Sequence, residues 1–167
     1  MLVGHSMGGL VIPHVAHRRP VERMVFICAM YDNLPEPAPG VEIPDIDRLN
    51  FDMSLLTVDE SFTTVDRDGA KGAFFPDCSP ADAEWAVAQL RPQGHAPAIA
   101  LEAPWPDVPS TIIVTTDDRG TEHTRKCVAP LLGVEPIELP GGHSPFLSRP
   151  AHLADVLDDL TSDVRTA

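Results

Sequence analysis

The sequence MLVGHSMGGL (residues 1–10) contains the pattern G-x-S-x-G, formed by Gly4, Ser6 and Gly8. In this pattern the serine lies on a sharp turn between a strand and a helix, which leaves its hydroxyl exposed. The turn strains the serine backbone and crowds its neighbours, and we expect the two glycines to relieve that crowding. The pattern therefore predicts a nucleophilic Ser6, with the backbone N–H of Met7 directed at a developing oxyanion.

A glycine-rich turn can also carry a serine that has no chemical role, so the flanking segments decide between the two interpretations. Residues 10–19 have helical spacing of apolar side chains, although Pro13 is unfavourable inside a helix. Residues 23–30 (RMVFICAM) form a continuous apolar run, which is typical of a strand buried on both faces of a parallel sheet. The order strand, turn, helix, strand favours the catalytic interpretation of the turn.

The middle of the chain is rich in proline and has an irregular sequence pattern. Residues 31–106 contain many of the 18 prolines, and we predict that they form an inserted lid and not a part of a sheet. Within them, residues 79–90 are predicted to be a helix, with Ser79 as its cap and Pro80 at its first position. The predicted organisation is a core segment (1–30), the lid (31–106) and a second core segment (107–167).

Two acidic residues and one histidine complete a possible site in the second core segment. The β-branched residues 111–115 predict a strand that is followed by Asp117 and Asp118, at the edge where α/β sheets place their sites. Either aspartate could instead cap a helix. His143 follows a second predicted strand (135–139) and a Gly-Gly turn, and the other six histidines have weaker claims.

The chain order serine, aspartate, histidine is one of the orders found in convergent catalytic triads. In such a triad Ser6 attacks, His143 accepts and returns the proton, and the aspartate fixes the imidazole tautomer. The residues alone leave the choice between Asp117 and Asp118 open.

Composition excludes several classes of function. The formal net charge of −13 disfavours nucleic acid and anionic membranes as partners. The three cysteines are far apart, so neither a disulfide framework nor a zinc site is indicated. No apolar run of roughly 18 residues and no secretion signal are evident, and we expect a cytoplasmic protein without a cofactor or metal.

The stretches GHSMGG, VTTDDRG and PGGHSPFLSRPAHLADVL together resemble the α/β-hydrolase fold family, in the esterase-like branch that includes methylesterases and hydroxynitrile lyases. The resemblance implies an α/β fold with a mainly parallel sheet, helices on both faces and an inserted lid. It implies Ser6 as nucleophile, His143 as base, Asp118 in preference to Asp117 as acid, and Met7 as an oxyanion donor. The implied function is a serine hydrolase that cleaves a small carboxylic ester through an acyl-enzyme.

The chain departs from this family at its beginning. The family places several strands, a helix and a loop with the second oxyanion N–H before the serine, and only Met1, Leu2 and Val3 precede the pattern here. We therefore expect an N-terminally truncated fold with an exposed apolar edge. The loss of one oxyanion donor typically costs ~10²–10³ in rate, so we expect weak or absent turnover if the chain truly begins at Met1.

The same residues are compatible with two other functions. The chain could be a non-catalytic fragment or binding module that retains the motifs by descent. A lyase that uses the same triad is disfavoured, because Ser144 and Pro145 follow His143 where such lyases tend to place a lysine. The sequence indicates no oligomeric state.

Overall fold

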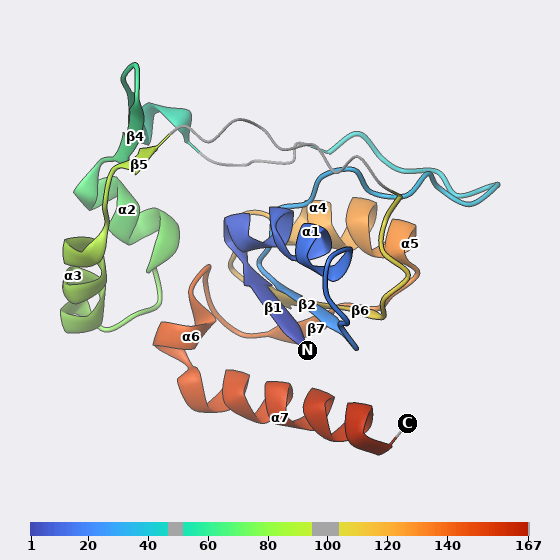
Figure 1. Cartoon of the computed structure of the whole chain (residues 1–167). Helices are drawn as coiled ribbons and strands as arrows, with labels where there is room; N and C mark the ends of the chain where they lie inside the picture. Colours follow the sequence, from blue (N-terminus) through green and yellow to red (C-terminus); the bar gives the residue numbers. More distant parts are fainter. Residues whose placement is uncertain (47–51, 95–103, 167) are drawn as a thin grey trace.

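Four parallel strands form the central sheet of the computed structural model, which describes residues 1–46, 52–94 and 104–166 (Figure 1). Their order across the sheet is β1-β2-β6-β7, and every neighbouring pair is parallel. The strands are β1 (Leu2–His5), β2 (Met24–Ile27), β6 (Ser110–Thr115) and β7 (Ile137–Leu139). Because all four run the same way, the turns that follow them gather at one edge of the sheet.

Helices cover both faces of this sheet, as the sequence predicted (Figure 1). Consecutive residues of β2 point to opposite faces: Val25 packs toward the last helix, and Phe26 packs toward the first. All four residues of β2 are buried, which explains its continuous apolar sequence. One face carries η1 (Ser6–Leu10), α1 (Ile12–Ala16), α4 (Thr121–His123), the π-helical η3 (Thr124–Val128) and α5 (Ala129–Leu132), and the other carries α7 (Pro150–Thr166), which follows α6 (Pro145–Ser148).

The helical boundaries differ from the sequence prediction in two places. The helix expected over residues 10–19 is a 3-10 turn followed by the short α1, in which Pro13 occupies the first turn. The proline is tolerated there because its missing N–H has no intrahelical partner at that position. The final helix α7 begins at Pro150, and the short helix α6 before it was not predicted.

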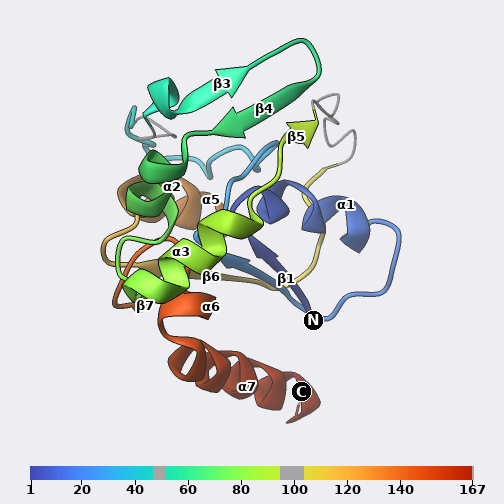
Figure 2. The ribbon, with the colours of Figure 1, turned by 90° about the vertical axis from the view of Figure 1, so that its left-hand side faces the viewer.

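Residues 53–94, which lie between β2 and β6 in the sequence, form a separate group of elements beside the main sheet (Figure 2). The expectation that no sheet occurs here was wrong, because β3, β4 and β5 pair as a small antiparallel sheet. The carboxylate of Asp59 accepts hydrogen bonds from the N–H groups of Ser61 and Phe62, at 2.7 and 2.6 Å, and so closes the turn between β3 and β4. The elements are η2 (Met53–Leu55), β3 (Leu56–Val58), β4 (Phe62–Val65), α2 (Arg67–Phe74), α3 (Pro80–Gln89) and β5 (Gln93–Gly94).

The predicted start of α3 is confirmed. Ser79 Oγ accepts a hydrogen bond from the N–H of Asp82 at 3.2 Å, and Pro80 is the first helical residue. Parts of the proline-rich stretches of this middle region, residues 47–51 and 95–103, lie outside the described residues.

Close packing at the first turn fixes where η1 lies against the strand edge. A Cβ atom added at Gly4 would lie 2.8 Å from the carbonyl oxygen of Gly8, so position 4 requires glycine as expected. The same expectation for Gly8 was wrong, because an added Cβ there meets no heavy atom within 4 Å. The second close approach is at Gly9, where a Cβ would meet the carbonyl oxygen of Met30 and lie 2.8 Å from Ala29 Cβ.

We predict that Gly9→Ala destabilises the fold by about 2 kcal/mol, because the added methyl group must displace backbone. Gly8→Ala is the matched control, since its methyl group enters open space. The free energy of unfolding of both variants can be measured by urea denaturation. Equal stabilities would contradict the packing described for Gly9.

Candidate active site

Ser6 occupies a strained turn at the carboxyl end of β1. It is the first residue of η1 and has φ of +50°, in the left-handed region that non-glycine residues seldom adopt. Its carbonyl oxygen accepts a hydrogen bond from the N–H of Met30 at 2.9 Å, which ties the turn to the loop after β2. Strain that surrounding contacts hold in place is typical of functional positions. The strained serine between a strand and a helical turn matches the local geometry that the sequence pattern predicts.

Asp118 and His143 are joined by a hydrogen bond of 2.8 Å between His143 Nδ1 and Asp118 Oδ1. Asp118 follows β6 and His143 follows β7, and their side chains are only 10% and 15% exposed. With Nδ1–H donating to the carboxylate, His143 Nε2 is free to accept a proton. Asp117 is exposed, and its backbone N–H bonds to Gly141, so Asp118 is the acid that meets the imidazole.

The structure brings the predicted residues to one edge of the sheet but does not link all of them by hydrogen bonds. Within the described ranges, no hydrogen bond joins the Ser6 hydroxyl to His143. Met7 is 46% exposed, and its sulfur accepts a hydrogen bond from Gln93 Nε2 at 3.4 Å. Catalytic hydrogen bonds are often unformed before substrate binds, so this separation does not argue against a reaction.

The turn before His143 is tied to the end of β6. Thr115 Oγ1 donates to the carbonyl oxygen of Gly142 at 2.9 Å. The N–H of Gly141 donates to Thr116 Oγ1 at 3.2 Å, and Gly141 has φ of +111°, which favours glycine. The strand that leads to Asp118 therefore also holds the loop that carries His143.

His5 contacts His143 directly, which sequence reasoning missed. His5 Nε2–H donates to the carbonyl oxygen of His143 at 2.8 Å, and the two ring centroids are 4.7 Å apart. The ring of Phe146 meets His5 edge-on at 4.9 Å. Burial, with a further contribution from the neighbouring His143, lowers the pKa of His5 to about 4. No local pattern could have indicated this contact, because it spans 138 residues of sequence.

Cys28 also lies beside Asp118 and His143, a contact that no sequence motif indicates. One ligand atom from each of Cys28, Asp118 and His143 lies within 4.8 Å of the others, so these residues could hold a zinc-like ion. Such an ion would have to replace the hydrogen bond between Asp118 and His143. Burial also raises the pKa of the Cys28 thiol to about 12, and its sulfur is 3.3 Å from Thr115 Oγ1. The thiol is therefore protonated at neutral pH, which opposes metal binding.

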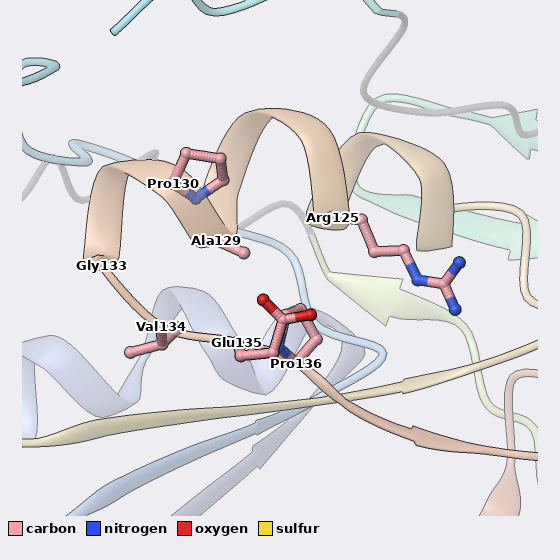
Figure 3. Close-up of a pocket in the computed structure, with 7 residues that line it drawn as sticks. All are labelled: Arg125, Ala129, Pro130, Gly133, Val134, Glu135 and Pro136. Atoms are coloured by element: carbon pink, nitrogen blue, oxygen red, sulfur yellow. The ribbon is translucent and has the colours of Figure 1, made fainter.

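A surface hollow of about 460 Å³ lies away from these residues (Figure 3). It is bordered by η3 and α5 and by the segment that leads into β7, at the end of that strand opposite His143. It contributes no side chain to the site at the carboxyl edge. Its lining residues are Arg125, Ala129, Pro130, Gly133, Val134, Glu135 and Pro136.

Within the described ranges, none of the helices is both long enough and apolar enough to cross a lipid bilayer.

Comparison with solved structures supports the fold described above. A variant of tomato methylketone synthase I is 17% identical, with a TM-score of 0.72 and coverage of 98% of this chain and 70% of that one. The Arabidopsis methylesterase MES16 is 19% identical, with a TM-score of 0.69 and coverage of 96% and 68%. A pyrethroid hydrolase from Sphingobium faniae JZ-2 is 22% identical, with a TM-score of 0.67 and coverage of 96% and 70%. At these identities the likeness establishes the fold alone.

Sequence comparison agrees with the structural one. The alpha/beta hydrolase nvfD of Aspergillus novofumigatus (strain IBT 16806) is 24% identical over 171 residues. The match covers 90% of this chain and 65% of that protein, so the chain spans less than two thirds of this relative's length. Residues 1–156 match the model of the Alpha/beta hydrolase family. Because that match covers most of the chain, the protein belongs to the Alpha/beta hydrolase family.

Proposed function

We propose that the chain is a serine hydrolase that cleaves a small carboxylic ester through Ser6, His143 and Asp118. The observation that carries this proposal is the 2.8 Å hydrogen bond from His143 Nδ1 to Asp118, at the sheet edge that also carries the strained Ser6. Family membership and the esterase and hydrolase names of the structural relatives agree with this reaction class. No cofactor or metal enters the proposed reaction.

Each residue has a defined role in the proposed reaction. Ser6 Oγ attacks the ester carbonyl carbon while His143 Nε2 takes the hydroxyl proton. The backbone N–H of Met7 donates to the oxyanion that forms. His143 then returns the proton to the departing alcohol, and Asp118 stabilises the imidazolium between these two steps. Water attacks the acyl-enzyme in the same way and releases the acid.

We further propose that residues 31–106 form the lid that shapes the substrate site. Phe74 of α2 supports this, because its ring centroid is 5.7 Å from that of His143. The contact between Gln93 and Met7 joins the same segment to the turn that follows Ser6. We also propose a cytoplasmic location, which the three free cysteines favour, and a small-molecule partner only, with neither nucleic acid nor membrane.

The lowered pKa of His5 makes the stability of the fold depend on pH. The folded protein holds its pKa near 4, below the ordinary value of 6.5, so between these values the unfolded chain binds more protons. Stability contributed by this residue is therefore complete above pH 6.5 and declines as the pH falls toward 4. His143 and Asp118 are the titratable groups that face the His5 ring.

Replacing the proposed catalytic residues should abolish covalent labelling by a fluorescent fluorophosphonate. We expect no labelling of Ser6→Ala, and labelling of His143→Ala and Asp118→Asn that is slower by about 10⁴-fold. Asp117→Asn is the matched control and should be labelled at a rate near that of the wild type, because its side chain is exposed. Hydrolysis of short-chain aryl esters would provide a second measure.

Folded wild-type protein that is never labelled would overturn the proposal and favour the alternative of a non-catalytic binding module. Circular dichroism establishes folding in that experiment. Labelling that persists in Ser6→Ala would show that a different residue reacts, and would equally rule out the proposed nucleophile.

We predict that His5→Gln makes the protein less sensitive to acid. Glutamine can still donate to the carbonyl oxygen of His143 but does not titrate. Between pH 7 and pH 4.5 the wild type should lose about 2 kcal/mol more free energy of unfolding than the variant does. Urea denaturation at the two pH values measures this difference. Parallel losses in the two proteins would mean that His5 does not titrate as described.

A further inference from the structure

The segment that joins α2 to α3 lies directly on the glycine turn before His143. A Cβ atom added at Gly142 would lie 2.9 Å from Asp77 Oδ1 and 3.0 Å from Pro76 Cδ. A Cβ atom added at Gly141 would meet Asp77 Oδ2. Both glycines are buried. The turn therefore lacks side chains because Pro76 and Asp77 occupy the space that side chains would need.

Asp77 is held in this place by an ion pair with Arg149. Arg149 Nη1 donates to Asp77 Oδ2 at 2.6 Å, and the side chains are 35% and 16% exposed respectively. The guanidinium borders the turn as well, since a Cβ atom at Gly141 would lie 3.0 Å from Nη1. Arg149 follows α6, so the pair joins segments that are 72 residues apart in sequence.

The same turn is also tied to the end of β6: Gly142 accepts a hydrogen bond from Thr115, and Gly141 donates one to Thr116. That strand leads to Asp118, the hydrogen-bond partner of His143. The turn is thus in contact both with the end of the strand that leads to Asp118 and with the Asp77–Arg149 pair. Its position sets the position of the imidazole that follows it.

We propose that Asp77 and Arg149 are positioning residues: their ion pair fixes the turn at residues 141–142 and thereby holds His143 in place against Asp118. The catalytic meaning of this inference rests on the proposed function. The position of His143 can be tested separately, without turnover.

The charge of Arg149 is what the arrangement depends on. Asp77 Oδ1 is buried and has no hydrogen-bond partner among the described residues. A carboxylate tolerates such an environment only when a cation balances it, because an unpaired buried charge is strongly destabilising. Without Arg149, the Asp77 side chain would rotate toward water and would no longer pack on the glycine turn at residues 141–142. Since one hydrogen bond joins the pair, lysine at position 149 can replace arginine in this role.

The experiment compares Asp77→Asn, Arg149→Gln, the double variant and Arg149→Lys with the wild type. Glu84→Gln is the matched control, because it breaks an ion pair with Lys71 between α2 and α3 that does not touch the turn. Two quantities are measured: the rate of fluorophosphonate labelling, and the NMR signals of the His143 imidazole, assigned with His143→Ala.

We expect Asp77→Asn and Arg149→Gln each to shift the His143 signals and to slow labelling by at least about tenfold, because small displacements of a catalytic group are costly. The double variant should be no slower than the slower single variant, as for residues that act as one unit. Arg149→Lys and Glu84→Gln should keep the wild-type signals and rate.

Unchanged His143 signals in both single variants, or effects that add in the double variant, would overturn the inference. If Asp77→Asn does not fold, the comparison of Arg149→Gln with Arg149→Lys decides, since equal behaviour of these two removes any role for the charge. If no protein is labelled, the wild type included, the proposed function fails, while the NMR signals still test the positioning role.

Discussion

The parallel register of β1, β2, β6 and β7 is the constraint on which the whole site depends. Residues that are separated by most of the chain meet because each follows the carboxyl end of a strand in the same sheet. Ser6 follows β1, Asp118 follows β6 and His143 follows β7. A change of register in one strand would move its loop along this edge and separate the side chains. The buried residues of β2, which lie between β1 and β6, fix that register from both faces.

Much of the core could be predicted from sequence because its signals are local. The apolar run at β2 and the β-branched residues of β6 indicate buried strands by composition alone, and Pro150 marks the start of α7. The middle region was harder to interpret. Its strands β3, β4 and β5 are two to four residues long. They are too short to show the alternation of apolar and polar residues that identifies a strand.

The residues of the candidate site also differ in whether a local sequence signal indicates them. Ser6 and His143 stand in short glycine-containing motifs, so the sequence alone could identify them as candidates. The choice between Asp117 and Asp118 depends on which carboxylate turns inward after β6, and only packing decides that. His5, Asp77 and Arg149 reach the glycine turn or His143 from elements distant in sequence. Long-range contacts of this kind produce no periodic pattern and no characteristic residue spacing in the sequence.

The hydroxyl of Thr115 fixes the direction of two buried hydrogen bonds, one with Gly142 and one with Cys28. Its single hydrogen is committed to the carbonyl oxygen of Gly142, so toward Cys28 the oxygen can only accept. The thiol must then be the donor, and the three groups form a one-way chain from sulfur to carbonyl in which each bond strengthens the next. The Cys28 thiol is thus a protonated hydrogen-bond donor and not a second nucleophile. Its sulfur is consequently a poor target for oxidants and alkylating reagents, although it lies close to the residues proposed to carry the chemistry.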